Sequence, residues 1–460
     1  MMTKREGFLT VDELESAGIT TVMVVTPDVS GRLAGRRVPV EIFLDIADHG
    51  LEICTCAWAW DVDQSFDLID AGKLAVCSMD NGAPDVLLRP DLSTLRRAAW
   101  LDGVAVVFGD PEDPVTGEPL TLSPRVILKR QLAALKEKGL TPQVGTELEF
   151  YLFENNPRSL RKSGFREELE PTTLYASDFM LQEGNTYEPF FQKLRADLKA
   201  SGILVEAAQN EWGTGQWEMT FVYGEALEMA DRHALYKMAV RDSATRAGMS
   251  VTFMAKPLAD QAGSSCHVHT SFVDDAGNPV LWSDTAEHHF SDTMRHAVAG
   301  VLEHLPEFML WYVPTINGYV RSNSQDVAGF GRTWGIANRS CSVRVVGHAP
   351  KSLRFEFRIP GADTNPYLTL SGIFASVADG VTRELEPPAM STGNAYNGDA
   401  GVQVATTLAE AARDFGASDF VTELLGEEDA SHYRIMAEHE WTVAQAAVTD
   451  WQLRRYFDRI

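Results

Sequence analysis

The stretch GTELEFYLF at residues 145–153 sets the constraint that the rest of the chain must satisfy. Polar and apolar residues alternate at its start and aromatic residues fill its end, which predicts a β-strand. Side chains two positions apart on a strand share a face, so Glu147 and Glu149 point in one direction. Two adjacent carboxylates repel each other unless a cation lies between them. A strand with a solvated polar face is the ordinary alternative for this stretch alone.

A second acidic stretch, QNEWGTGQWEMTF at residues 209–221, contains a Gly-Thr-Gly turn signal between two aromatic strand segments. If the chain reverses direction at this turn, Glu211 and Glu218 lie near each other. An ordinary hairpin with exposed glutamates has the same pattern.

The third stretch, SCHVHTSF at residues 265–272, places His267 and His269 on one face of a strand. Imidazole binds divalent metals readily, and the spacing also suits phosphate contact. An isolated His-x-His pair is more often structural.

The fourth stretch, LRFEFRI at residues 353–359, places Arg354, Glu356 and Arg358 on one face with phenylalanines behind them. Further cations precede it at Arg321, Arg339, Arg344 and Lys351. A guanidinium group can bind phosphate or carboxylate through two parallel hydrogen bonds. Each arginine alone can equally be an ordinary surface charge.

Taken together, the four stretches predict phosphoryl transfer. Carboxylate-rich sites favour Mg²⁺ or Mn²⁺, and nearby Arg and Lys side chains suit a polyphosphate. In such sites the metal ions bridge phosphate oxygens while arginine stabilises the transferred charge. The chain has no GxxxxGK[ST] motif, which excludes a P-loop nucleotide site.

Composition restricts the protein class. The chain has 460 residues, 45% of them hydrophobic, and a net charge of −25. This length predicts two domains, and the acidic balance argues against nucleic-acid partners. Five cysteines without a CxxC pair indicate a reducing cytoplasm, and the Cys-Thr-Cys at 54–56 is too isolated to predict a zinc site. We find no signal peptide and no run long enough for a membrane span.

Turn-rich segments divide the chain. The stretch at 110–119 is rich in Pro, Gly and acidic residues, and we take it as the boundary between a small strand-rich domain at 7–119 and a larger one at 120–460. Long helices are expected at 123–139, 187–200, 225–247, 291–304 and 368–385. Their alternation with strands predicts an α+β fold, with a mostly antiparallel sheet backed by helices.

These motifs resemble those of the glutamine synthetase family and occur in the same order along the chain. The resemblance covers most of residues 120–460. Besides the four stretches, the similar segments are NRS at 338–340, NPY at 365–367 and VTDW…RYF at 448–457. Residues 7–120 resemble the family's small N-terminal β-grasp domain more loosely. The resemblance implies a curved antiparallel sheet (a half-barrel) backed by helices in the catalytic domain. It also implies a ring-shaped homo-oligomer, a dodecamer, with active sites between subunits.

The resemblance implies a role for each matching residue. One divalent ion is assigned to Glu149, Glu211 and Glu218, and a second to Glu147, His267 and Glu356, with two or three Mg²⁺ or Mn²⁺ ions expected per site. ATP contacts are assigned to Glu206, His269, Ser271, Lys351 and Arg354. Glutamate contacts are assigned to Gly263, Arg321 and Arg339, and handling of the transferred phosphoryl group to Arg344 and Arg358. The implied reaction phosphorylates the γ-carboxylate of glutamate and then displaces phosphate with an amine.

The departures from the family concern the ammonium site. The family's ammonium-binding Asp falls near AWAWDVD at 57–63, where Asp61 or Asp63 is the candidate, and the flap Glu is replaced near Asp326 and Val327. Ala262 stands where the family has an Asn in the glutamate site. These losses favour an organic amine over ammonium.

Aromatic residues suggest walls for such an amine, with Trp58, Trp60 and Phe330 as the candidates. The ordinary alternative is that both tryptophans belong to the core of the small domain. A true glutamine synthetase, in which Asp326 and Asp61 or Asp63 handle ammonium, remains the alternative function. A phosphagen kinase fits the motifs poorly, and a non-catalytic relative has no physical need for so many charged side chains.

Overall fold

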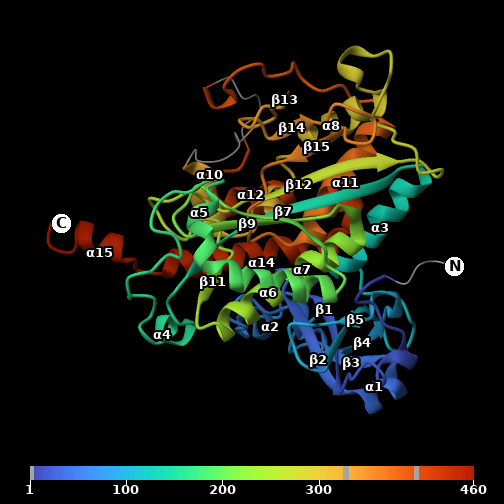
Figure 1. Cartoon of the computed structure of the whole chain (residues 1–460), viewed down its shortest axis with the longest axis vertical. Coiled ribbons are helices and arrows are strands. Elements are labelled where there is room, and N and C mark those ends of the chain that lie inside the picture. Colours follow the sequence, from blue (N-terminus) through green and yellow to red (C-terminus); the bar gives the residue numbers. More distant parts are fainter. Residues whose placement is uncertain (1–4, 325–330, 398–403) are drawn as a thin grey trace.

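The computed structural model describes residues 5–324, 331–397 and 404–460, which form two sheets with helices around them (Figure 1). The smaller sheet has the strand order β2-β1-β6-β4-β3, with β5 paired to β6. Its strands are β1 (Thr21–Pro27), β2 (Leu33–Pro39), β3 (Leu51–Cys54), β4 (Asp85–Pro90), β5 (Arg96–Arg97) and β6 (Val104–Glu112). Its helical segments are η1 (Val11–Glu13), α1 (Val40–Ile46), η2 (Thr55–Trp58), α2 (Asp67–Asp70) and η3 (Leu92–Thr94).

The larger sheet has the order β13-β14-β15-β12-β7-β9-β8, with β10 and β11 paired to β7. Its strands are β7 (Thr141–Phe153), β8 (Val205–Asn210), β9 (Gln216–Phe221), β10 (Gly224–Glu225), β11 (Ser250–Thr252), β12 (Cys266–Val273), β13 (Trp334–Ile336), β14 (Val343–Val346) and β15 (Arg354–Phe357). The pairs are antiparallel except β13 with β14, which makes this sheet mixed. The predicted α+β class is confirmed.

Helices cover the larger sheet and extend from it (Figure 1). They are α3 (Pro124–Glu137), α4 (Pro157–Lys162), α5 (Leu181–Gly184), α6 (Glu188–Ala200), α7 (Ala226–Arg246), α8 (Asp292–Glu303), α9 (Met309–Tyr312), α10 (Ile316–Asn323), α11 (Pro366–Thr382), α12 (Leu408–Gly416), α13 (Asp419–Leu425), α14 (Glu427–Ala446) and α15 (Asp450–Tyr456). Short 3-10 turns are η4 (Asn185–Tyr187), η5 (Glu287–His289) and η6 (Ala395–Asn397). None of the described helices is long and apolar enough to cross a bilayer.

The five predicted long helices are confirmed. They appear as α3, α6, α7, α8 and α11 within a few residues of their expected bounds. Residues 11–13 form the turn η1, and the connection 155–184 contains α4 and α5. The predicted boundary stretch 110–119 is partly ordered into the small sheet. Strand β6 continues through Glu112, and Glu112 forms an isolated antiparallel β-bridge with Pro119. The domain boundary at 119/120 stays a prediction.

The apolar face of the large sheet packs against a helical layer with α11 at its centre. Leu148, Phe150 and Phe355 are fully buried in this core, as are most residues of α11. Helices α8 and α11 cross closely at Gly300, where a Cβ atom would lie 2.1 Å from the Ser376 carbonyl oxygen. The close crossing therefore requires glycine at this position. The layer holds the opposite, polar face of the sheet in place.

A buried arginine joins the two parts of the chain. Arg125 of α3 is fully buried and contacts the carboxylates of Asp91 (3.0 Å), Asp110 (2.7 Å) and Asp231 (3.1 Å). Asp91 and Asp110 belong to the small sheet region, whereas Asp231 lies on α7 and accepts a 2.7 Å hydrogen bond from the Tyr367 hydroxyl. Arg125 therefore pairs with three carboxylates from two parts of the fold, and Lys129 of the same helix adds a second cation beside Asp91 and Asp110.

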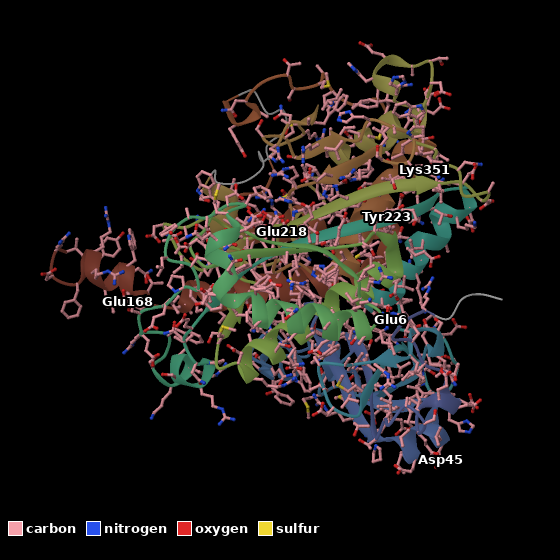
Figure 2. The ribbon with its side chains drawn as sticks, in the orientation of Figure 1. Glu6, Asp45, Glu168, Glu218, Tyr223 and Lys351 are labelled. Atoms are coloured by element: carbon pink, nitrogen blue, oxygen red, sulfur yellow. The ribbon has the colours of Figure 1, made fainter. Side chains whose placement is uncertain are left out.

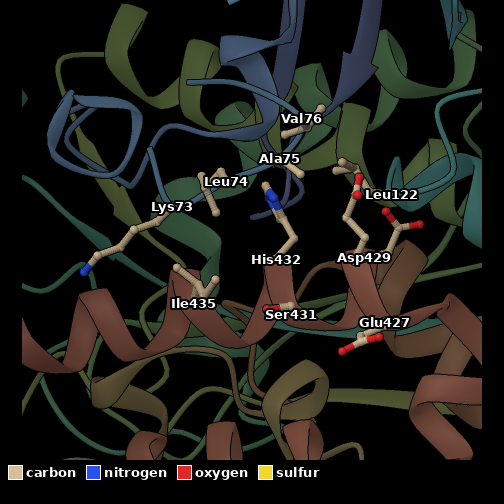
Figure 3. Close-up of a pocket in the computed structure, with 11 residues that line it drawn as sticks. Lys73, Leu74, Ala75, Val76, Leu122, Glu427, Asp429, Ser431, His432 and Ile435 are labelled. Carbon is tan, nitrogen blue, oxygen red and sulfur yellow. The ribbon is translucent and has the colours of Figure 1, made fainter. Parts of the chain in front are cut away.

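Helix α14 makes a second joint with the small domain. The buried His432 imidazole donates a 2.9 Å hydrogen bond from Nε2 to the Trp58 carbonyl oxygen. A cavity of about 360 Å³ lies beside this contact, between α14 and residues 73–76 (Figure 3).

Replacing Arg125 with leucine should destabilise the fold strongly, because three partly or fully buried carboxylates lose their shared cation. We expect the free energy of unfolding to fall by about 3–5 kcal/mol, measured by urea unfolding. Arg195→Leu is the control, because Arg195 pairs with Glu188 at the surface and should cost less than about 1 kcal/mol. Equal losses in the two variants would contradict the proposed joint.

Candidate active site

The four acidic and basic stretches lie on neighbouring strands of the large sheet. Strand β7 pairs with β9 on one side and β12 on the other, and β12 pairs with β15. The register places Glu147 opposite His267 and Glu149 opposite Glu218. It also places Glu356 opposite His269 on one side and Arg344 on the other. Residues from four separate parts of the sequence thus share one face.

Two histidines hold Glu147. His267 Nδ1 lies 3.2 Å and His269 Nε2 lies 2.9 Å from its two carboxylate oxygens. Arg354 Nε donates a 3.0 Å hydrogen bond to His269 Nδ1, which leaves Nε2 of that ring as the donor to Glu147. Burial acts to raise the pKa of Glu147, but the hydrogen bonds from His267 and His269 outweigh it and hold the pKa below its ordinary value. Glu147 is therefore ionised at neutral pH.

Glu356 is compensated by arginines. It is 1% exposed, and its two oxygens contact Arg344 Nη1 at 2.8 Å and Arg358 Nη1. Burial opposes ionisation, yet His267 and Arg358 lower the pKa of Glu356 to about 2. Arg344 and Arg358, which were predicted to bind the transferred phosphoryl group, thus form ion pairs with Glu356, a predicted metal ligand.

At the other three glutamates, burial and neighbouring carboxylates outweigh the groups that favour ionisation. Burial and the nearby Glu211 raise the pKa of Glu149 to about 8, and burial with Glu147 and other carboxylates raises the pKa of Glu218 to about 10. Burial and the charge of Asp178 raise the pKa of Glu211 to about 7. Gln209 Nε2 bridges Glu211 and Glu218 at 3.2 and 3.1 Å, as expected from the turn between them. Each of these carboxylates would ionise readily beside a cation.

Two overlapping groups in the described residues could hold a metal ion. Glu147, Glu218 and His267 form one, and Glu147, His269 and Glu356 form the other, with ligand atoms within 4.8 Å of one another in each. Carboxylate oxygen and imidazole nitrogen suit Mg²⁺ or Mn²⁺. His269 was predicted as an ATP contact, and here it also takes part in a candidate metal group.

Of the predicted ATP residues, His269 and Arg354 belong to the Glu147 cluster, and the other three are exposed or half-buried. Lys351 is exposed in the turn before β15, apart from Glu218 along the sheet (Figure 2). Ser271 is half-buried on β12, and Glu206 is exposed at the irregular start of β8. Tyr223, an exposed aromatic side chain that the sequence reasoning missed, has its Cβ close to Gly145 of β7.

The predicted glutamate residues are divided between buried and open positions. Arg321 is fully buried and donates to the Ile359 carbonyl at 2.9 Å and to the Ser265 hydroxyl at 2.8 Å. Gly263 packs against it, since a Cβ there would lie 2.7 Å from Arg321 Cγ. Arg339 is exposed and lines a cavity of about 770 Å³ with its neighbours in 336–340, residues 390–394 and Tyr396.

The predicted amine-side residues lie in the small domain. Trp58 is fully buried in its core and donates to the Pro27 carbonyl at 3.2 Å, so in this chain its side chain has the structural role that was the alternative. Trp60 is half-buried. Asp61 accepts 2.8 and 2.7 Å hydrogen bonds from Ser65, with His439 at 3.7 Å. Asp326, Val327 and Phe330 lie outside the described residues.

Two supporting residues were missed from the sequence. Gln216 Nε2 and the Ser265 backbone N–H donate to the same oxygen of Glu149, at 3.0 and 2.8 Å. These two hydrogen bonds orient the Glu149 carboxylate against the repulsion from its acidic neighbours. Gln216 lies two residues from Glu218 on one strand face, a spacing that could have identified it.

Comparison with known proteins agrees with this geometry. The family model for the glutamine synthetase catalytic domain matches residues 121–456. The chain is 41% identical to gamma-glutamylethanolamide synthetase GlnA4 of Streptomyces coelicolor, over 98% of this chain and 96% of that protein. It is 33% identical to glutamate–isopropylamine ligase of Pseudomonas sp, over 98% and 97%.

Solved structures of GmaS are also similar. The ligand-free form has a TM-score of 0.83 and an ADP complex has 0.84, each at 25% identity; they cover 97% and 98% of this chain, and 99% of the GmaS chain in each case. The shared fold, the strand motifs and the near full-length similarity converge on one conclusion. The chain belongs to the glutamine synthetase family and is an ATP-dependent glutamate–amine ligase.

Proposed function

We propose that the protein joins the γ-carboxyl group of glutamate to a small primary organic amine, with ethanolamine as the first candidate. The observation that carries this proposal is the shared face of β7, β9, β12 and β15, where six acidic or imidazole ligands meet two arginines. Such a face suits ATP-driven activation of a carboxylate. The amine is proposed from the similarity to ligases for ethanolamine and isopropylamine.

The donor set fits divalent ions. Glu149, Glu211 and Glu218 lie together on one face, and burial with neighbouring carboxylates raises their pKa values. We assign Glu149, Glu211 and Glu218 to one Mg²⁺ or Mn²⁺ and Glu147, His267 and Glu356 to a second. When bound, the ions would neutralise phosphate oxygens of ATP.

The reaction has two steps. A γ-carboxylate oxygen of glutamate attacks the terminal phosphorus of ATP, the bond to the bridging oxygen breaks, and ADP leaves. The amine nitrogen then attacks the γ-carbonyl carbon. The bond between that carbon and the phosphate oxygen breaks, inorganic phosphate leaves, and the nitrogen loses a proton. The first step is needed because a carboxylate is a poor acyl donor until one oxygen becomes part of a good leaving group.

Arginines on the shared face would stabilise the negative charge of the transferred phosphoryl group. Arg344 and Arg358 already present guanidinium groups toward Glu356, so a phosphoryl group arriving there meets two cations without a large rearrangement. Lys351, Arg354, His269, Ser271 and Glu206 would contact ATP, and Arg321, Arg339 and Gly263 would shape the glutamate site.

An organic amine is favoured over ammonium because the acidic groups of an ammonium pocket are depleted. Both oxygens of Asp61 are already engaged by Ser65 in its own loop. The flap position holds Val327 in place of the family's Glu. We further propose that residues 7–119 of one subunit face residues 120–460 of the next in a cytoplasmic ring, a dodecamer, so that Asp61 and Trp60 approach a neighbour's site.

An amine panel tests the substrate. We expect phosphate release from ATP, with Mg²⁺ and glutamate present, to show a kcat/KM for ethanolamine or another small alkylamine at least about tenfold above that for ammonium, a difference of about 1.4 kcal/mol. The panel holds ammonium, ethanolamine, isopropylamine, putrescine, spermidine and aniline, with glutamate omitted as the control. A highest kcat/KM for ammonium would instead identify a glutamine synthetase, with Asp61 and Asp326 as the residues to replace next.

Arg358→Gln should impair chemistry more than folding. Removing one positioned cation from the shared face of the large sheet should lower kcat by about 100- to 1000-fold in the phosphate-release assay. Arg383→Gln is the matched control, because Arg383 is an exposed partner of Asp379 on α11 and its loss should leave kcat unchanged. Similar kcat values for the two variants would contradict the role of Arg358.

Metal binding should release protons. Glu149, Glu211 and Glu218 have pKa values raised to about 8, 7 and 10, so much of this group is protonated at neutral pH in the ion-free protein. Because the ion binds the ionised carboxylates, its apparent affinity should rise from about pH 6 to pH 9. Calorimetric titration with Mn²⁺ in buffers of different ionisation enthalpy checks this. Heats independent of the buffer would contradict it, and Glu218→Gln should release fewer protons than the native chain.

A further inference from the structure

Three cysteines of the small domain lie outside the chemistry described above. Cys54 ends β3 and Cys56 lies in η2, whereas Cys77 lies in the loop before β4. The sequence alone predicts no metal site at Cys54 and Cys56, because no third ligand is near them in the chain. The fold brings Cys77, 21 residues beyond Cys56, against the pair.

The three sulfur atoms have the spacing of a metal site. Cys56 Sγ and Cys77 Sγ are 3.5 Å apart, and all three Sγ atoms lie within 4.8 Å of one another. A zinc–thiolate bond is about 2.3 Å, so thiolates around one ion are roughly 4 Å apart. The Cys56 backbone N–H donates to Cys54 Sγ at 3.2 Å, which orients that sulfur. Small side-chain rotations would therefore suffice for binding.

The surroundings select a soft ion. Within the described chain, the group contains three sulfur atoms and no carboxylate or imidazole, a donor set that disfavours Mg²⁺ and favours Zn²⁺-like ions. Cys56 and Cys77 are buried among Leu68, Ile69 and Leu74, whereas Cys54 is partly exposed. Residues 73–76, which precede Cys77 in the chain, form one wall of the cavity beside α14 (Figure 3).

We propose that Cys54, Cys56 and Cys77 bind one thiophilic divalent ion of the Zn²⁺ class, which fastens the loop before β4 to the end of β3. Each thiol gives its proton to solvent as its sulfur–metal bond forms, and water completes the tetrahedron. The ion closes a loop that contains Trp58, Trp60 and Asp61, so it would hold this stretch of the small domain in one arrangement. The site is separate from the Glu and His residues of the large sheet.

Cadmium is the probe, because Cd²⁺ bound to thiolates absorbs in the ultraviolet whereas Cd²⁺ bound to carboxylate and imidazole does not. The reduced full-length protein, kept in excess Mg²⁺, should develop this absorption up to one equivalent of Cd²⁺ per chain. Cys56→Ser and Cys77→Ser should each lose the tight one-equivalent endpoint. Cys341→Ser, which removes a buried cysteine outside the group, should keep it.

A measurement on the unaltered chain covers the case in which a variant fails to fold. Zn²⁺ should slow alkylation of Cys54 at least about tenfold, and a chelator should restore the rate. Absence of both the absorption and the protection, with the thiols shown to be reduced, would overturn the proposal. So would a Cys56–Cys77 disulfide in the protein as isolated, or an unchanged endpoint in folded Cys77→Ser. None of these readouts depends on which amine the enzyme uses.

Discussion

Repulsion among carboxylates on one face of the large sheet is the constraint on which the active site depends. The site divides into two halves according to how that charge is compensated. Glu147 and Glu356 are paired with His267, His269 and arginines, and their pKa values are lowered. Glu149, Glu211 and Glu218 accept hydrogen bonds from Gln216, Ser265 and Gln209, and burial with neighbouring carboxylates raises their pKa values. The second half is thus prepared to take up cations.

The remainder of the catalytic region holds this unfavourable face in place. Strand β7 carries Glu147 and Glu149 on one side and buried Leu148 and Phe150 on the other, so burial of the apolar side fixes the direction of the acids. The packed helices behind the sheet, with the close crossing at Gly300, resist the rearrangement that repulsion would otherwise cause. Stability of the core and charge density at the site are therefore linked.

The small domain contributes a different kind of chemistry. It is attached through Arg125 and through the contact of α14 with Trp58, both buried and polar. Such joints specify orientation because a displaced partner would leave a buried charge or carbonyl unsatisfied. The stretch with Trp60 and Asp61 begins beside the Trp58 contact with His432, and in the chain it lies between Cys56 and Cys77.

Most long helices and the shared faces of the strands follow from periodicity and turn signals in the sequence alone. Ser123-Pro124 and Gly139 bracket α3, and the two-residue period places Glu147 with Glu149 and His267 with His269. The pairing of distant strands then set which of these side chains became neighbours. The tertiary structure also buried Trp58, which sequence pattern cannot distinguish from a pocket aromatic, and it brought Cys77 to Cys56. The physical reason is that periodicity fixes a residue's face, whereas its partners depend on pairing between segments far apart in the chain.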